Sequence, residues 1–455
     1  MWAATMNPIL AELRAMARLA APLVVGQVAL MTLNVVDLAM AGRLGAEPMA
    51  ALAVATTLFY AVIVVAQGLV MGLDPFVAQA YGAGEHRRCG LWLLRGIVVA
   101  VVTTLPVVLM LAFAGGPLLR LLHQPAELIP TSTLYLRALC PGILFRLLYV
   151  ACRQVLQAQG KVVLPVTVAL LANGVNALAD YALIHGVWGV PAMGVVGVGL
   201  ATSVCDAFMG LSLLAAVLAG PFLRGHGRWR LAEVLDLTAL RSFFRVSLPL
   251  AFQTGVEGWG FVFTGLMAGW LGALVVASHQ VTMNLAAVVY MVPLGLSSAL
   301  VVRVGHAVGR SDPAALRRAV GVGLGVGACI ALFTASLFAL APGPLAGIYT
   351  QDAAVLALSV SLLPLAAAFQ LFDALQVVGL GVLRGLGDTR FPALASLLGF
   401  WALGLPIGGW LAFGGGLGAR GIWIGLVIGL TIMCAVVLLR IRWKLARPLE
   451  RVEDG

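Results

Sequence analysis

The chain has 455 residues, of which 62% are hydrophobic and only 10% are charged. A soluble domain carries about 25% charged residues, so this composition excludes a soluble globular protein and indicates a polytopic membrane protein. The net charge of +10 does not point to a nucleic-acid partner, because the arginines cluster at the ends of apolar segments.

Apolar windows of membrane-spanning length occur twelve times along the chain. A spanning helix needs about 20 mostly apolar residues. Windows of that kind centre near residues 27, 61, 104, 142, 175, 207, 257, 290, 331, 368, 402 and 430. The windows near 142 and 257 are the weakest, because Arg137, Arg146 and Glu257 dilute their hydropathy. We therefore predict an all-α polytopic membrane protein with twelve transmembrane helices.

The positions of Lys and Arg predict the orientation. With both termini in the cytoplasm, 24 of the 28 basic residues fall in inner loops, at inner helix ends or at the termini. The four exceptions are Arg43, Arg120, Arg137 and Arg420. Cytoplasmic loops carry an excess of Lys and Arg, so we expect a multi-pass protein with cytoplasmic termini.

An internal repeat divides the chain into halves. Residues 40–46 (MAGRLGA) recur as residues 267–273 (MAGWLGA), an offset of 227, and the same offset relates Pro22 to Pro249. A unit of six helices starts both halves on the same side of the membrane, so the repeats are parallel. We predict an N-lobe at residues 1–222, a basic cytoplasmic linker at 223–245 and a C-lobe at 246–455, around a central cleft.

Four carboxylates interrupt the apolar windows: Asp37, Asp180, Glu257 and Asp373. A charge near a bilayer centre costs about 2.5–3.5 kcal/mol on insertion scales, and such acids usually serve ions, protons or charged ligands. The acids do not follow the repeat, since Asp37 aligns with Thr264. The two lobes therefore share a scaffold and differ in chemistry.

Polar side chains accompany the acids of the first half. Gln27, Asn34 and Asp37 share one face of the first predicted helix, Asn173, Asn176 and Asp180 share a face of the fifth, and Thr202 adds a hydroxyl from the sixth. Their oxygens suit a small hard cation such as Na⁺, and two neighbouring buried acids equally suit a shared proton. A satisfied interhelical hydrogen-bond cluster is the structural alternative. Function is favoured, because no Lys or Arg is expected deep in these helices.

The second half carries a different polar set. Gln253 and Glu257 lie four residues apart, as do Gln280 and Asn284, while Phe369, Gln370, Asp373 and Gln376 follow one another along the tenth helix. This set suits an organic cation, through charge and ring-face attraction, or the coupling cation. For Phe369 and Tyr290 taken alone, core packing is the better interpretation.

Several of these segments resemble the multidrug and toxic compound extrusion (MATE) family of transporters, in its bacterial NorM-type branch. The resemblance covers roughly residues 15–440. It rests on Asn34–Asp37 followed by Ala41-Gly42, on Gln79–Gly84 (QAYGAG), and on Phe372–Gln376 running on to Leu383–Thr389 (LRGLGDT). Glu257 matches the acid of the seventh helix that marks the NorM branch.

The resemblance implies two six-helix lobes around a V-shaped cleft. It also implies a secondary active antiporter of the inner membrane that exports amphipathic, often cationic drugs in exchange for Na⁺ or H⁺ by rocker-switch alternating access. The implied partners are small-molecule drugs and the lipid bilayer, with no nucleic acid, no cofactor besides the coupling ion, and a monomeric chain. The implied ion-binding residues are Asp37, Asn176, Asp180 and Thr202 in the N-lobe, with Glu257 and Asp373, the Na⁺ candidates, in the C-lobe. The implied substrate-binding residues are Asn34, Asp37, Glu257, Gln280, Tyr290, Phe369 and Asp373. Phe369 stands where some relatives carry Tyr.

Three alternatives are weaker. A lipid-linked oligosaccharide flippase of the same superfamily needs basic residues for phosphates, whereas this cleft is expected to be acidic with no buried Lys or Arg. A cation channel is disfavoured by the repeated lobes. A membrane enzyme is disfavoured because no nucleophile–base pair, CxxC motif or metal-ligand spacing occurs. The residues themselves do not distinguish Na⁺ from H⁺.

Overall fold

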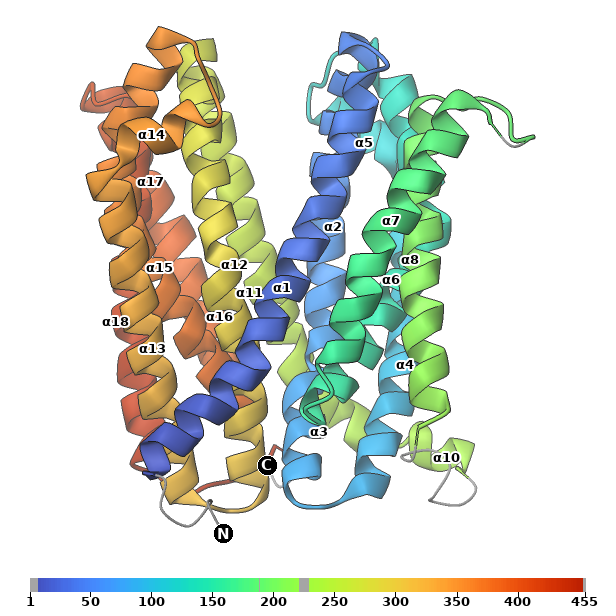
Figure 1. Cartoon of the computed structure of the whole chain (residues 1–455), viewed down its shortest axis with the longest axis vertical. Coiled ribbons are helices and arrows are strands. Elements are labelled where there is room, and N and C mark those ends of the chain that lie inside the picture. Colours follow the sequence, from blue (N-terminus) through green and yellow to red (C-terminus); the bar gives the residue numbers. More distant parts are fainter. Residues whose placement is uncertain (1–6, 188, 221–228, 453–455) are drawn as a thin grey trace. The chain divides into compact units, whose positions relative to one another are not determined.

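The computed structural model describes residues 7–187, 189–220 and 229–452, which are helical throughout apart from short connections. The helices, as labelled in Figure 1, are α1 (Pro8–Gly42), α2 (Ala46–Met71), α3 (Leu73–Gly82), α4 (His86–Leu109), α5 (Gly115–Leu121), α6 (Leu128–Ala158), α7 (Val163–His185), α8 (Val195–Leu218), α10 (Leu231–Val234), α11 (Leu237–Trp270), α12 (Ala273–Gly309), α13 (Pro313–Leu340), α14 (Pro342–Gly347), α15 (Ala353–Gly385), α16 (Arg390–Ser396), α17 (Leu405–Gly409) and α18 (Ala419–Leu445). Three π-helical stretches continue neighbouring helices at Met110–Ala114, Leu397–Gly404 and Trp410–Gly414.

The predicted twelve spans correspond to helices of the structure. Eleven helical segments within the described ranges are long and apolar enough to cross a membrane. The twelfth is α11, a helix of 34 residues whose hydropathy is lowered by Gln253 and Glu257. The apolar window near residue 257 is weak for the same reason.

The chain divides into two compact units. The N-terminal unit is Val25–Ala251, and the C-terminal unit is Phe252–Gly455 together with the chain up to Val24. Each boundary lies inside a long helix, shortly after Pro22 in α1 and Pro249 in α11. Proline removes one helical hydrogen bond, so these are natural places for a helix to bend. The predicted lobe limits at 222 and 246 stay a prediction.

The first part of α1 is anchored within the C-terminal unit. Glu12 accepts two hydrogen bonds from Arg303 of α12, from Nε at 2.7 Å and from Nη2 at 2.6 Å. Further along, Val24 lies directly against Gly295, where an added Cβ would meet the Val24 nitrogen at 2.8 Å. Only a glycine permits this approach of α1 to α12.

The first part of α11 is anchored in the same way within the N-terminal unit. Ser247 lies against Gly72, where an added Cβ would meet the Ser247 Cα at 2.7 Å. Ser247 follows Val24 by 223 residues and Gly295 follows Gly72 by the same 223. The two contacts are therefore equivalent in the repeat, and in each of them the first half of a long helix packs against a glycine from the other half of the sequence.

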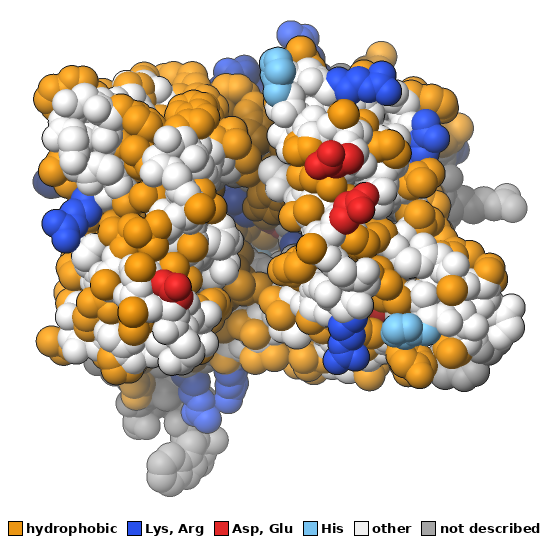
Figure 2. All heavy atoms as spheres, turned by 90° about the horizontal axis from the view of Figure 1, so that it is seen from above, with side chains coloured by type: hydrophobic (Ala, Val, Ile, Leu, Met, Phe, Trp, Pro, Cys, Tyr) orange, Lys and Arg blue, Asp and Glu red, His pale blue; other side chains and the backbone are white. Residues whose placement is uncertain are grey.

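Large apolar side chains cover the outer surfaces of both units. Examples are Leu340, which is 86% exposed, Phe113 at 72% and Phe333 at 71%. Seen from one end, hydrophobic side chains dominate each unit and charges are scattered among them (Figure 2). A soluble protein would rarely expose apolar area on this scale, whereas lipid tails accommodate it.

Candidate functional site

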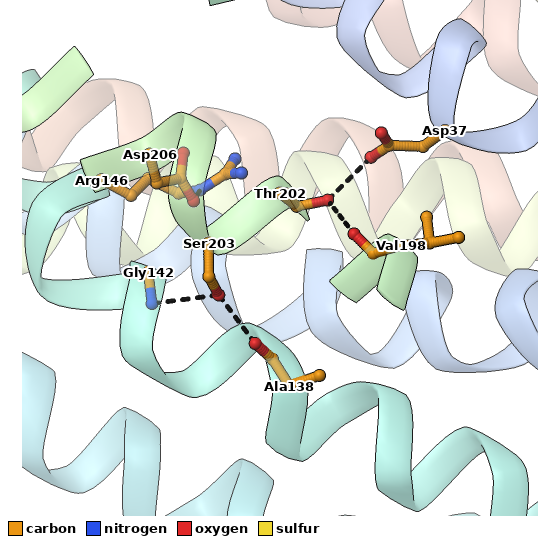
Figure 3. Close-up of polar contacts among 8 residues, drawn as sticks. All are labelled: Asp37, Ala138, Gly142, Arg146, Val198, Thr202, Ser203 and Asp206. Atoms are coloured by element: carbon orange, nitrogen blue, oxygen red, sulfur yellow. Dashed lines mark hydrogen bonds and ion pairs between the residues drawn. The ribbon is translucent and has the colours of Figure 1, made fainter. Parts of the chain in front are cut away.

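Four predicted residues of the N-terminal unit meet in one buried group, which we call the first carboxylate cluster: Asp37, Asn176, Asp180 and Thr202. Asn176 Nδ2 donates to Asp37 Oδ1 at 2.9 Å, and Thr202 Oγ1 lies 3.0 Å from Asp37 Oδ2. The Thr202 hydroxyl has one proton, which it shares between Asp37 and the Val198 carbonyl, also at 3.0 Å (Figure 3). Helices α1, α7 and α8 thus converge on Asp37.

The second acid of the cluster lacks donors. Asp180 is fully buried, and neither of its carboxylate oxygens accepts a hydrogen bond from a donor group in the described chain. Its carboxyl lies close enough to the Asp37 carboxyl for the two groups to interact. Ionised carboxylates only accept hydrogen bonds, so Asp37 and Asp180 can form a hydrogen bond with each other only when one of them carries a proton.

Two amides extend this excess of acceptors. Asn176 Oδ1 and Asn173 Oδ1 are also buried without a donor among the described residues. Asn173 Nδ2 is occupied, because it donates to the carbonyls of Ala29 at 3.0 Å and Ala169 at 2.9 Å. An excess of buried acceptor oxygens over donors indicates a place for protons, water or a cation.

Asn34 is not part of the cluster. Its side chain is exposed on α1, one turn before Asp37, and it makes no hydrogen bond to another described residue. A substrate contact by Asn34 stays a prediction.

A half-buried arginine, Arg146, lies next to the cluster and was not expected there. Arg146 was counted among residues near an inner helix end, but it lies in the middle of α6, and its Nε donates to Asp206 Oδ2 of α8 at 2.9 Å. Asp206 is 2% exposed. The expectation of no deep Lys or Arg concerned the first, fifth and sixth predicted helices, whereas Arg146 comes from the fourth and lies beside the acids. Apolar windows predict where this helix lies in the sequence. They do not predict which helix packs against it or which side chains surround Arg146, because both depend on how the helices pack.

The C-terminal unit holds a second pair of acids. Glu257 Oε1 accepts a hydrogen bond from Gln253 Nε2 at 3.1 Å and from Ser396 Oγ at 2.7 Å. Asp373 on α15 is 4% exposed, accepts no hydrogen bond within the described chain, and lies close enough to Glu257 for the two charges to interact. Ser396, on α16, was not singled out from the sequence, because serine in a membrane helix is common and carries no pattern.

The remaining predicted residues of this unit differ in accessibility. Gln280 is exposed on α12 and its Nε2 lies 3.3 Å from Asn284 Oδ1, while Tyr290 is half-buried. Phe369 is only 2% exposed, and its ring packs edge-on against Trp423 at 5.6 Å and Phe261 at 6.2 Å. This burial fits the packing interpretation of Phe369, and its contact with substrate stays a prediction.

A family model named MatE matches the chain twice, at residues 22–182 and 249–410. The two matches begin 227 residues apart, which is the offset found in the sequence. The internal repeat is therefore confirmed.

Relatives of nearly full length exist in bacteria. "Multidrug resistance protein NorM" of Burkholderia vietnamiensis is 36% identical over 439 residues, covering 94% of this chain and 93% of that protein. "Multidrug resistance protein MdtK" of Edwardsiella ictaluri is 32% identical over 452 residues, covering 96% of each.

Solved structures share the fold. The "eukaryotic MATE transporter AtDTX14" aligns with a TM-score of 0.87 at 22% identity, covering 98% of this chain and all of that one. A structure described as an "outward-facing conformation of a multidrug resistance MATE family transporter of the MOP superfamily" aligns with a TM-score of 0.84 at 20% identity over 96% of each chain. Together with the sequence matches, these findings show that the chain belongs to the MatE family and is a membrane transporter, not an enzyme.

Proposed function

We propose that this chain exports amphipathic, often cationic small molecules, drugs among them, and that its first carboxylate cluster binds the coupling cation. The chain is a multidrug efflux antiporter of the MatE family, so export is driven by a cation moving the opposite way. A cation moving through 100 mV releases about 2.3 kcal/mol. That is enough to hold roughly a 50-fold gradient of a neutral substrate exchanged one for one.

One observation carries this assignment of the coupling site. Asp180 is a fully buried carboxylate with no hydrogen-bond donor in the described chain, and it lies close enough to Asp37 for the two groups to interact. A buried charge without compensation is unfavourable by several kcal/mol. A bound cation or proton removes that penalty, and its departure restores it, which is the property a coupling site needs.

The geometry favours a proton as the coupling ion. One proton placed between Asp37 and Asp180 converts two repelling acceptors into a hydrogen bond. Sodium is the second candidate, because the unsatisfied oxygens of Asp180, Asn176 and Asn173 form an oxygen-rich set of the kind that binds hard cations.

The acids of the C-terminal unit serve the cationic substrate in this proposal. Glu257 is held by Gln253 and Ser396, while Asp373 keeps its full acceptor capacity. A permanent positive charge on the substrate would compensate both acids. The same pair is a candidate Na⁺ site, with Gln280 and Tyr290 as candidate substrate contacts.

The presence of Arg146 beside the acids does not support the flippase alternative. A flippase would use an unpaired basic residue to hold a phosphate, whereas Arg146 is paired with Asp206 at 2.9 Å. The guanidinium is therefore already engaged by a carboxylate and is not free to hold a phosphate.

We further propose an inner-membrane location with both termini in the cytoplasm and a single chain as the transport unit. When Arg146 is left out because it lies in the middle of α6, 23 of the 28 basic residues still fall on the inner side in this orientation. Labelling of single cysteines placed at residues 161 and 352 in intact cells tests the orientation, with residue 352 expected to react and residue 161 to be protected.

Dye efflux in proteoliposomes, with a pH gradient and a Na⁺ gradient imposed separately, tests the coupling site. We expect wild-type efflux to follow the pH gradient, and Asp37→Asn and Asp180→Asn to abolish it. Asp352→Asn is the matched control, because it makes the same Asp-to-Asn change at the exposed N-cap of α15. We expect Glu257→Gln and Asp373→Asn to raise the half-saturating concentration of a cationic dye. Undiminished pH-driven efflux by well-expressed Asp180→Asn protein contradicts the proposal.

A further inference from the structure

The pair Arg146–Asp206 lies one helical turn along α8 from the first carboxylate cluster. Asp206 follows Thr202 by four residues, so both side chains leave the same face of α8. Figure 3 shows Asp37 beside Thr202 on one side and Arg146 with Asp206 on the other. The charges of Arg146 and Asp37 are close enough to interact.

Close packing of α6 on α8 fixes this arrangement. Ser203 Oγ donates to the Ala138 carbonyl at 2.7 Å and accepts from the Gly142 nitrogen at 3.2 Å. A Cβ at Gly142 would meet the Ser203 Cα at 2.7 Å and Asp206 Oδ2 at 3.1 Å. The glycine therefore lets α8 approach α6 until Asp206 lies opposite Arg146, one turn beyond the contact.

The ion pair between Arg146 and Asp206 uses only part of the hydrogen-bonding capacity of the two groups. Its hydrogen bond runs from Arg146 Nε alone, and Asp206 Oδ1 is buried without a donor in the described chain. The guanidinium lies 5.4 Å from the centre of the Phe59 ring. Two parallel hydrogen bonds from the guanidinium to both carboxylate oxygens would neutralise more of the arginine charge. Part of the positive field of Arg146 therefore acts on neighbouring groups.

We propose that Arg146 is a fixed counter-charge to the first carboxylate cluster and that Asp206 sets how strongly it acts. Arg146 is then a positioning residue that tunes the affinity for the coupling cation and does not contact the cation. The inference rests on the proposed coupling role of Asp37 and Asp180. Its physical basis is that arginine stays charged in proteins, so its field cannot be switched off by deprotonation.

The sign of the effect follows from the charges. Asp206→Asn leaves Arg146 unbalanced, and its positive field opposes cation binding at Asp37. Replacing both residues, as Arg146→Gln with Asp206→Asn, removes the field altogether. The titratable groups that face this region are Tyr135 and Arg146 on α6, Cys205 and Asp206 on α8, Asp37 on α1 and Asp180 on α7. The double variant replaces only Arg146 and Asp206, so the carboxylates of Asp37 and Asp180 are kept.

The test measures apparent cation affinity in the same proteoliposome assay, with whichever gradient drives the wild type. For Asp206→Asn we expect about a tenfold weaker affinity, the size expected for one unit charge acting across roughly a helix diameter at an effective dielectric near 20. That is about one pH unit lower for the midpoint of pH-driven efflux, or a tenfold higher half-saturating Na⁺ concentration. The double variant should return to within about twofold of wild type.

Ser203→Ala is the matched control, because it disturbs the same helix contact without changing a charge, and its affinity should stay within about twofold of wild type. If Asp206→Asn does not fold, a comparison of the cation affinities of Arg146→Gln and Arg146→Lys takes the place of that variant. The glutamine variant should then bind the cation more tightly, and the lysine variant should match the wild type.

Three outcomes overturn the inference: a folded Asp206→Asn protein with wild-type affinity, a double variant no better than Asp206→Asn, or an equal shift in Ser203→Ala. The proposed function fails separately, if Asp37→Asn itself leaves coupled efflux intact. When Asp37→Asn abolishes coupling but Asp206→Asn is silent, only the counter-charge role is lost.

Discussion

Removal of the Glu12 carboxylate should release the first part of α1 from α12. Glu12 accepts both hydrogen bonds of a two-pronged contact with Arg303, at 2.6 and 2.7 Å, and its side chain is 7% exposed against 23% for Arg303. Breaking a buried pair by removing one partner is destabilising by about 3–5 kcal/mol. Since water still reaches Arg303, we expect Glu12→Ala to lower the free energy of unfolding by about 2–3 kcal/mol. For a unit of about 200 residues this corresponds to a fall in Tm of roughly 4–12 °C.

Thermal unfolding in detergent, followed by tryptophan fluorescence, measures this change. The matched control is Glu85→Ala, which removes a carboxylate whose partner Arg88, at 2.9 Å, has a side chain that is 51% exposed. Exposed pairs contribute about 0–1 kcal/mol, so this variant should melt within about 2 °C of wild type. Replacing Glu12 and Arg303 together by leucine should recover most of the loss, because it leaves no unpaired charge. Equal Tm values for wild type and Glu12→Ala would refute the anchoring role of this pair.

Three further outcomes are expected. Gly295→Ala should destabilise the protein by about 1–3 kcal/mol, because its Cβ would press on the Val24 backbone, whereas Gly321→Ala has open space and should be neutral or slightly stabilising in the same melting assay. Phe369→Ala should lower the free energy of unfolding by about 3–5 kcal/mol, and Phe369→Leu should keep the wild-type half-saturating dye concentration, because we expect a ring this buried to pack and not to bind substrate. Hydrogen bonding from the Ala315 backbone nitrogen holds the pKa of Asp312 below its ordinary value of 3.8, so the stability it contributes is present above that pH and is lost as the pH falls through the lower, folded-state pKa. The Tm difference between wild type and Asp312→Asn should therefore be constant near pH 7 and shrink towards pH 3, and a difference that grows on acidification would contradict this.

Much of the fold and part of the site could be predicted from local pattern. Lipid requires long apolar helices whose backbone groups bond internally, so twelve windows of apolar residues predicted the helices. The offset of 227 residues predicted the repeat that the two MatE matches confirm. The cluster of Asp37, Asn176 and Asp180 was predictable as well, because polar residues are so unfavourable in lipid that those sharing a helix face turn inwards together.

The sequence by itself therefore determined the helices, their repetition and the acids that interrupt them, since each depends on spacing along one segment. Tertiary structure alone decided the partners. The pairing of Arg146 with Asp206 depends on the bare Gly142 that lets α6 and α8 meet, and the burial of Phe369 depends on Trp423 from α18. Contacts between helices far apart in the chain leave no period in the sequence, and a side chain's depth and neighbours are fixed only when the helices pack. For that reason the carboxylates could be predicted from the sequence, whereas the position of Arg146 beside them could not.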